Sequence, residues 1–455
     1  MIYHVTDFGA IADGKTLSTL AIQAAINECN ACGGGTVMLD GGNFVSGTIY
    51  LKSNVRLEID ISAKLIASGN ISDYGDDTHY NRYVNEQEMD RCFIFAADAE
   101  NIEMCGGGQV DGNAELFPNE GSIYRPMLFR FLRCKNIKMS NMRFYNAAAW
   151  TTAFLDSENI WIDNLDIKNT KRYNGDGLDF DGCKNVFIKG CKIRGTDDNL
   201  CLQSSSENYP MENVHISDCM FTSLCAGIRI GLKSIGSIRS VTITNCTFKN
   251  VWREGVKIEC TEGGSISDII ASNLVMINVT RPLFVLLNNR FADIGSSIGL
   301  DKMPNIGTLD NVSFSNIIIK DTAEMKNIHL RFAADIMGRP EFAGIRIDAN
   351  DNHPIRNVSI SNLSYEFIGG VKRADIPNEY PKVPDLTVET TKLKNCVPFV
   401  SENYYPDWSR MAFMDIRNVQ GLYLSGIRLK LLNSDERPPY GMENCEILKE
   451  EIYVI

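Results

Sequence analysis

Three aspartates, Asp176, Asp197 and Asp198, lie in two short acidic motifs whose residue types suit acid–base chemistry. Asp176 follows Asn174 and Gly175, and the adjacent pair comes about one structural repeat later. One carboxylic acid of such a set can protonate a leaving oxygen while another carboxylate activates water or attacks an anomeric carbon. Crowded carboxylates also raise one another's proton affinity, which keeps one of them protonated near neutral pH. These residues predict hydrolysis of a glycosidic bond.

The elements that must position the aspartates form a repeat. Each copy has a small polar residue, an aliphatic residue, any residue and an apolar residue, and copies start at Asn136, Asn159, Asn185, Asn213, Ser240, Asp268, Asn311, Asn357 and Gly421. The early steps are 23, 26, 28, 27 and 28 residues. Alternation of apolar and polar residues predicts strands, and units that cannot bury their own apolar face must stack. We therefore predict an all-β, right-handed, single-stranded parallel β-helix, because an antiparallel sandwich would need hairpins at shorter spacing.

The two ends of the chain depart from the central repeat. Residues 18–31 have helical spacing and precede three glycines, so residues 1–50 are expected to form an N-terminal cap with one short helix. Residues 51–455 are expected to form the β-helix, with long loop insertions after about residue 289, where the repeat steps lengthen. The Pro- and Tyr-rich stretch from Asp375 to Trp408 is the candidate wall or lid.

An alignment of the coils places the acidic residues in columns. The anchors are Leu178, Leu200, Ile228 and Val256, each of which begins an apolar-x-apolar pair. The outward columns are then Asp176, Asp198, Ala226 and Glu254; Asp179, Cys201, Arg229 and Lys257; and Asp181, Gln203, Gly231 and Glu259. Strands roughly 4.8 Å apart bring carboxylates of successive coils within one sugar ring of each other. A lone turn aspartate usually only binds nearby backbone, but a column of them favours a site.

Composition argues against several classes of binding partner. A net charge of −12 argues against nucleic acid, and the absence of a long apolar span argues against a membrane. The fourteen cysteines include Cys183, Cys191, Cys219 and Cys246 inside apolar repeat segments, where they are expected to be reduced core residues. We expect no metal site and no cofactor. With no leader in this sequence, we expect a cytoplasmic protein, or a secreted one if a leader has been removed.

At these motifs the sequence resembles glycoside hydrolase family 28, the polygalacturonase family, over most of the chain. The resemblance rests on Val-Thr-Asp-Phe-Gly-Ala at 5–10, Gly-Gly-Gly-Thr-Val at 33–37, Asn-Gly-Asp at 174–176 against the family's Asn-Thr-Asp, and Thr-Asp-Asp at 196–198 against its Gly-Asp-Asp. It implies a pectin-lyase-like β-helix in which Asp197 is the general acid and Asp176 and Asp198 hold the attacking water of an inverting reaction. Trp150, one coil earlier, would either stack on a sugar face or lie half-buried in the coil. Asn174 and Asp179 are further candidates for substrate binding.

Two motifs depart from the family. Its Gly-His-Gly appears here as Cys-Ala-Gly at 225–227, and its Arg-Ile-Lys appears as Lys257, Ile258 and Glu259. The basic pair is expected to hold a galacturonate carboxylate, which a glutamate would repel. Either the substrate is neutral at that subsite, or another exposed cation, Arg229 or Arg281, holds the carboxylate. We keep these two arginines, Lys257 and Glu259 as candidate substrate-binding residues.

The function expected from the sequence is a glycoside hydrolase that acts on pectin-type oligosaccharides, inverting and exo-acting. Exo action follows from the expected location, which excludes intact polymer, and from insertions that can close one end of a groove. A calcium-dependent polysaccharide lyase is the first alternative, with Asp179, Asp181 and Asp198 on the metal and Lys257 or Arg229 as base. A non-catalytic carbohydrate-binding β-helix is the second alternative.

Overall fold

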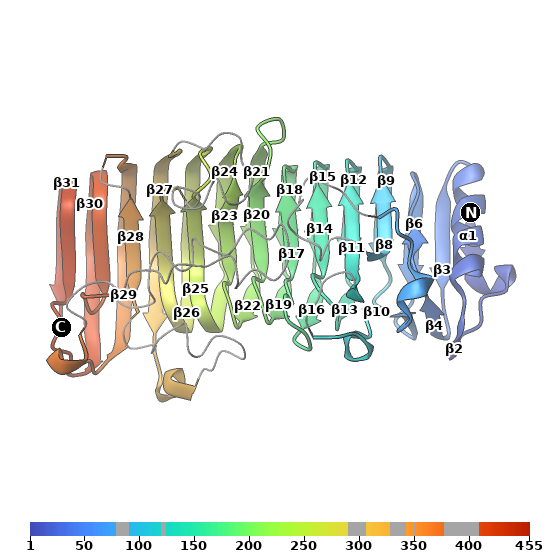
Figure 1. The fold of residues 1–455 in the computed structure, drawn as a ribbon, viewed down its shortest axis with the longest axis horizontal. Helices are drawn as coiled ribbons and strands as arrows, with labels where there is room; N and C mark the ends of the chain where they lie inside the picture. Colours follow the sequence, from blue (N-terminus) through green and yellow to red (C-terminus); the bar gives the residue numbers. More distant parts are fainter. Residues whose placement is uncertain (79–90, 120–123, 290–305, 328–342, 350–351, 377–408) are drawn as a thin grey trace, which may run out of the picture. The chain divides into compact units, whose positions relative to one another are not determined.

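The computed structural model describes residues 1–78, 91–119, 124–289, 306–327, 343–349, 352–376 and 409–455 (Figure 1). The chain divides into two compact units. Unit 1 comprises Met1–Cys201 and Met211–Cys219, and unit 2 comprises Leu202–Pro210 and Met220–Ile455. Each unit is built from strands that pair in parallel with the strand one coil away, so the predicted parallel β-helix is confirmed.

The described part of unit 1 contains one α-helix and a series of short strands, which pair in three parallel sheets. The first sheet holds β1 (Ile2–His4), β3 (Gly35–Leu39), β6 (Val55–Ile59), β9 (Glu100–Cys105), β12 (Lys135–Ser140), β15 (Glu158–Asp163), β18 (Lys184–Lys189) and β21 (Met211–Ser217). The second holds β2 (Asp13–Leu17), β4 (Gly42–Ser46), β7 (Ala63–Ala67), β10 (Gln109–Asp111), β13 (Arg143–Tyr145), β16 (Asp166–Asn169) and β19 (Lys192–Gly195). The third holds β5 (Ile49–Tyr50), β8 (Cys92–Ala97), β11 (Met127–Leu132), β14 (Thr152–Leu155) and β17 (Leu178–Asp181), and the segment that enters β20 (Leu200–Ser204) continues it. Short 3-10 helices lie at Val5–Phe8, Ile71–Asp73 and Ala114–Leu116.

Unit 2 continues the same type of coil with longer strands. Its elements are β22 (Met220–Ser223), β23 (Ile228–Ser234), β24 (Ser237–Thr244), β25 (Thr247–Cys260), β26 (Ser265–Leu287), β27 (Thr308–Lys320), β28 (Ile345–Ala349), β29 (Ile355–Gly369), β30 (Met414–Asn433) and β31 (Tyr440–Val454), with 3-10 helices at Ala323–Asn327 and Arg373–Asp375. In β26 one continuous strand pairs with β24, β25, β27 and β28. The candidate lid at 375–408 lies almost wholly outside the described residues, as do large parts of the predicted insertions.

The predicted N-terminal helix is confirmed as α1 (Thr19–Ala31). It buries Ile22, Ala25, Ile26 and Cys29 and packs on β3, β5 and β6 of unit 1. The strands before residue 50 pair with those of the first coils, as β3 does with β6. The domain boundary expected at residue 50 therefore stays a prediction. Within the described residues, no helix has the length and hydropathy needed to cross a membrane.

The first residue of each repeat has a common backbone conformation. All nine starts lie in the left-handed region, from φ 51° at Asn357 to φ 76° at Gly421. Asn, Asp and Gly reach this region at the lowest cost, which explains the small polar residue in the pattern. In unit 1 the asparagines also form a ladder of side-chain hydrogen bonds of 2.8–3.1 Å through Asn54, Asn101, Asn136, Asn159, Asn185 and Asn213.

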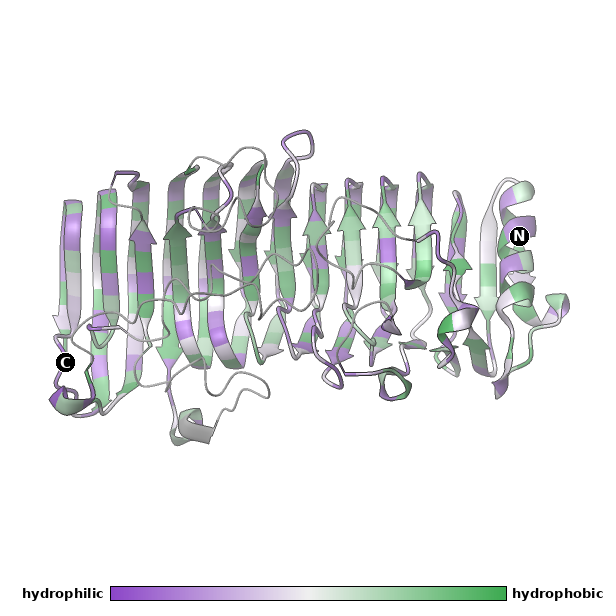
Figure 2. Cartoon of the chain, in the orientation of Figure 1, coloured by the Kyte–Doolittle hydropathy of each residue, from purple (hydrophilic) through white to green (hydrophobic). Residues whose placement is uncertain are grey.

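Alternating apolar residues fill the interior of each coil (Figure 2). Phe131, Phe154 and Phe180 stack on successive coils of unit 1 with ring centroids 5.0 and 4.8 Å apart. The cysteines in the described part of the chain carry reduced thiols, and those at 183, 191, 219 and 246 are buried. The prediction of reduced core thiols in the repeat segments is therefore confirmed.

Candidate active site

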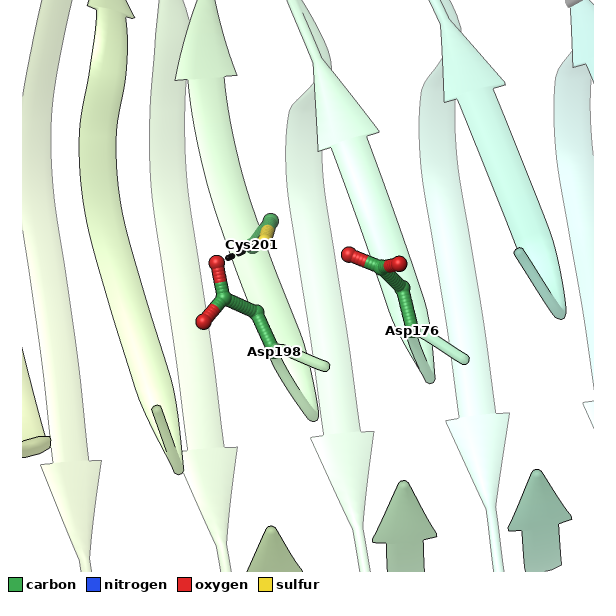
Figure 3. Close-up of side chains that lie close together, drawn as sticks. All are labelled: Asp176, Asp198 and Cys201. Atoms are coloured by element: carbon green, nitrogen blue, oxygen red, sulfur yellow. Dashed lines mark hydrogen bonds between the residues drawn. The ribbon is translucent and has the colours of Figure 1, made fainter. Parts of the chain in front are cut away.

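Asp176 and Asp198 occupy matching positions on neighbouring coils of unit 1. Asp176 lies two residues before β17, and Asp198 lies two residues before β20. The backbone N–H of Gly177 donates to the carbonyl of Asp198 (3.0 Å), and that of Leu178 donates to Asn199 (2.9 Å). The predicted register between Leu178 and Leu200 is therefore confirmed. The side chains of Asp176, Asp198 and Cys201 lie close together on these two coils (Figure 3).

A contact between Gly175 and Thr196 ties the two aspartate turns together. The N–H of Gly175 donates to the Thr196 hydroxyl oxygen (3.0 Å), and this hydroxyl donates to the carbonyl of Arg172 (2.5 Å). The N–H of Thr196 donates to the carbonyl of Asn169 (3.1 Å). A Cβ at position 175 would lie 2.3 Å from the Thr196 hydroxyl oxygen and 2.4 Å from the Asn169 carbonyl. Only glycine fits there, so Asp176 is held by a turn without free space.

The acidic residues differ in exposure. Asp176, Asp179 and Asp198 are 5%, 4% and 2% exposed, whereas Asp197 is only half-buried. Burial, and then the charges of Asp197, Asp179 and Asp198, raise the pKa of Asp176 well above its ordinary value. The predicted mutual effect of crowded carboxylates is thus present at Asp176. The Oδ1 atom of this residue is buried and, among the described residues, accepts no hydrogen bond.

Cys201 is a site neighbour that the sequence placed in a column without assigning it a role. Its thiol is 2% exposed and donates to Oδ2 of Asp198 at 3.7 Å. One ligand atom each from Asp176, Asp198 and Cys201 lie within 4.8 Å of one another. The signal that could have found Cys201 is its position, since it follows Asp198 by three residues in the strand that carries the site.

Two predicted substrate-binding residues have structural partners in unit 1. Asn174 adopts a left-handed conformation (φ 52°), and its side-chain oxygen accepts a hydrogen bond from Arg125 (2.8 Å). Arg125 is 1% exposed and also donates to the carbonyl of Tyr173 (2.6 Å), so it fixes the start of the Asp176 turn. Trp150 is partly buried against the apolar side chains of the neighbouring strands. Its predicted place one coil before Asp176 is confirmed, because the N–H of Thr151 donates to the Asp176 carbonyl (3.1 Å).

A cavity of about 460 Å³ opens in unit 1. Its lining includes Tyr74, Asp76, Arg91 and Tyr124. Arg91 directly precedes β8, and β8, β11, β14 and β17 are successive strands of one sheet. The cavity therefore lies three coils before Asp176, a distance of about 14 Å along the stack.

Unit 2 contains a buried set of charged side chains, which we call the basic cluster. It consists of Arg229, Arg253, Glu254, Lys257, Glu259 and Arg281 on β23, β25 and the adjoining part of β26, each at most 6% exposed. Glu259 Oε2 lies 3.0 Å from Arg229 Nη2 and 3.5 Å from Lys257 Nζ. Glu254 pairs with Arg281 and lies 3.6 Å from both Lys257 and Arg253. The two glutamates are therefore neutralised by four cations.

The basic cluster corrects one expectation and confirms another. Strand register pairs Arg229 with Lys257 and Gly231 with Glu259, as the columns predicted. The expectation that Arg229 and Arg281 are exposed charges is wrong, because they are 5% and 4% exposed and bound to glutamates. A position that points away from the coil interior is not thereby open to solvent. Asp179 and Asp181 in unit 1 illustrate the same point at 4% and 3% exposure.

Comparison with known proteins identifies the family. The family model described as glycosyl hydrolases family 28 matches residues 29–352. This chain belongs to glycosyl hydrolases family 28. A probable polygalacturonase of Vitis vinifera is 23% identical over 449 residues, which covers 88% of this chain and 87% of that protein. The exo-poly-alpha-D-galacturonosidase of Dickeya chrysanthemi is 22% identical over 455 residues, covering 85% of this chain and 74% of that protein.

Solved structures support the fold. The hyperthermoactive exopolygalacturonase of Thermotoga maritima aligns with a TM-score of 0.65 at 22% identity, over 80% of this chain and 87% of that one. A family 28 exopolygalacturonase of Yersinia enterocolitica aligns with a TM-score of 0.66 at 18% identity, over 100% of this chain and 78% of that one. The predicted right-handed parallel β-helix is confirmed. The prediction of a polygalacturonase-like glycoside hydrolase that acts on O-glycosidic bonds is also confirmed.

The structure also accounts for the altered acidic motifs of this family 28 member. Where the family pattern has Thr in the first motif and Gly in the second, this chain has Gly175 and Thr196. These two positions touch each other across the coils, and the Thr196 hydroxyl occupies the space that a side chain at 175 would need. Glycine and threonine have therefore exchanged places between the two motifs, and Asp176 and Asp198 keep matching positions on their coils.

Proposed function

We propose that this hydrolase cleaves pectin-type oligosaccharides that contain acidic sugars, by inversion and from a chain end. Asp197 is the general acid in this proposal, and Asp176 and Asp198 together hold the attacking water. The observation that carries the proposal is the pair of buried carboxylates on adjacent coils beside a half-buried third one.

The carboxylate geometry suits a shared water. A water that makes two hydrogen bonds of about 2.8 Å can join oxygens up to about 5.6 Å apart. The ligand oxygens of Asp176 and Asp198 are within 4.8 Å, so one water can contact both. Asp197 is more exposed than either, which suits a group that must reach the glycosidic oxygen. An inverting enzyme places its acid and base far enough apart to admit this water.

The raised proton affinity within the cluster supports general acid catalysis. The acid must keep a proton at the working pH, and an isolated aspartate does not. Because burial and neighbouring carboxylates raise the pKa of Asp176, the cluster retains one proton as the pH rises. In the proposed mechanism Asp197 gives this proton to the leaving oxygen, and the attacking water gives one of its own protons to Asp176 or Asp198, so the cluster ends with the proton it began with.

An acidic substrate is supported by the basic cluster and by the names of the relatives. Four cations face two glutamates among the described members of the cluster, so Glu259 does not present a bare negative charge. Lys257 and Glu259 stand where the family's Arg-Ile-Lys is expected to contact a carboxylate. We therefore favour a substrate with a carboxylate-bearing sugar over a neutral one.

Exo action and a cytoplasmic location belong to the same proposal. The Dickeya relative is named as an exo-acting enzyme. Buried reduced thiols suit a reducing compartment, where oligosaccharides rather than intact polymer would be the substrate. The cavity three coils before Asp176, about 14 Å along the stack, offers room for a further part of a bound chain.

The test is digestion of galacturonate oligomers of defined length with chromatography of the products. Release of terminal sugars from the first turnover supports exo action, whereas early long oligomers contradict it. Carboxyl-reduced oligomers serve as the control for acid recognition and should be poor substrates. Asp197→Asn should lose turnover on natural oligomers but retain much of it on an aryl glycoside, whose leaving group needs no protonation. If Asp176→Asn alone shows this selective retention, the general acid has been assigned to the wrong residue.

A further inference from the structure

We propose that Asp176, Asp198 and Cys201 form a binding site for one divalent transition-metal ion of the zinc class, and that a bound ion blocks hydrolysis. The ion is an inhibitor here and not a cofactor. The inhibitory consequence rests on the proposed function, whereas the binding itself does not.

The ligand set and its spacing fit such an ion. Zinc binds thiolate sulfur at about 2.3 Å and carboxylate oxygen at about 2.1 Å in tetrahedral geometry, which places these two ligands about 3.6 Å apart. The Sγ atom of Cys201 and Oδ2 of Asp198 are 3.7 Å apart. The ligand atom of Asp176 lies within 4.8 Å of both, so it need approach by at most about 1 Å. Two donors are thus already at coordination distance from each other, and the third is on the adjacent coil (Figure 3).

An independent observation points to a ligand at this place. Oδ1 of Asp176 is buried and accepts no hydrogen bond within the described residues, in a side chain that is 95% buried. A buried oxygen of this kind costs free energy unless a ligand, an ion or a proton satisfies it. A cation bound there would satisfy this oxygen.

The donor types select the class of cation. Calcium and magnesium prefer six or more oxygen ligands, whereas thiolate favours softer ions such as Zn²⁺. Three protein ligands leave a fourth position open, as in zinc sites that also hold water or substrate. Binding would remove the thiol proton and engage the two carboxylates that hold the attacking water. The ion would therefore compete with catalysis, and its affinity should fall as pH decreases.

Cobalt absorption and zinc calorimetry on the full-length protein test binding without reference to activity. With Co²⁺, the wild type should show a thiolate-to-metal charge-transfer band, and Zn²⁺ should displace it. Cys201→Ser should lose the band and weaken Zn²⁺ binding at least tenfold. Cys183→Ser, which changes another buried thiol of unit 1, should keep both. Ca²⁺ and Mg²⁺ should neither bind at this site nor displace Co²⁺.

Retention of the Co²⁺ band in Cys201→Ser, or absence of the band in the wild type, would overturn the inference. If Cys201→Ser does not fold, Asp176→Asn provides the same binding test through a different ligand and should also weaken Zn²⁺ binding. Zinc binding without any hydrolysis would refute the proposed function alone. Hydrolysis that resists Zn²⁺, with no Co²⁺ band, would refute the metal site alone.

Discussion

Gly175→Ala should strongly reduce catalysis because it displaces Asp176, while the chain stays folded. The new Cβ would lie 2.3 Å from the Thr196 hydroxyl and 2.4 Å from the Asn169 carbonyl, where ordinary contacts begin at 3.4 Å. The turn must therefore move by about 1 Å, and a displacement of that size costs about 100-fold in turnover. Overpacking of this kind costs about 1–3 kcal/mol of stability. We expect kcat to fall about 100-fold, with a smaller change in KM.

A double variant separates this contact from general damage. Thr196→Gly alone loses the hydrogen bonds to Gly175 and Arg172, at a cost of about 1 kcal/mol each. In Gly175→Ala with Thr196→Gly, the hydroxyl contact is gone but the Asn169 carbonyl remains, so kcat should recover only in part, by about tenfold.

The assay is kcat and KM on galacturonate oligomers together with Tm, and Gly190→Ala is the matched control. Gly190 lies in another turn of unit 1, where the nearest atom to an added Cβ is at 3.7 Å. Its positive φ of 67° should cost about 1 kcal/mol of stability and no activity. Wild-type kcat in Gly175→Ala, or a double variant no faster than the single one, would refute the claim that this contact positions Asp176.

Three further predictions concern stability. The raised pKa of Asp176 means that its ionisation opposes folding. The resulting loss of unfolding free energy is absent below pH 3.8, grows as the pH rises from 3.8 to the folded pKa, and stays constant above it. Asp176→Asn should therefore raise Tm at pH 7, lose activity, and show no Tm gain in acid. Burial raises the pKa of Asp321 to about 7, so the contribution of this residue to the free energy of unfolding should fall by about 4 kcal/mol between pH 4 and pH 7. Asp321→Asn should remove this dependence of the unfolding free energy on pH, and an unchanged dependence would contradict the prediction. Asn159→Ala should lose two hydrogen bonds of the asparagine ladder and strain the backbone at a φ of 58°. Asn159→Gly should lose only the two hydrogen bonds. Urea unfolding should therefore find the alanine variant about 1 kcal/mol less stable than the glycine variant.

The sequence was informative where periodicity controls structure. The repeat predicted the strands and their register, because inward and outward residues alternate with a period of two. The pairing of Arg229 with Lys257 and the matching positions of Asp176 and Asp198 followed from that alignment. The left-handed residue at the start of each repeat explains why the pattern begins with Asn, Asp, Ser or Gly.

The features that the sequence missed depend on contacts between residues far apart in the chain. Pairing of Arg229 with Glu259 removed both from solvent, although each position points out of its coil. The exchange between Gly175 and Thr196 becomes meaningful only when the two turns are seen to touch. The proximity of Cys201 to Asp198 depends on side-chain direction, which periodicity alone does not provide.

The stereochemistry of the first product tests the central claim most directly. Proton NMR during hydrolysis of an oligogalacturonate should show the new reducing end first in the configuration opposite to that of the cleaved bond, before mutarotation. That result follows if water held by Asp176 and Asp198 attacks from the face opposite to the leaving oxygen. A first product with the original configuration would mean that a carboxylate attacks the sugar itself, and would contradict the proposed roles of the three aspartates.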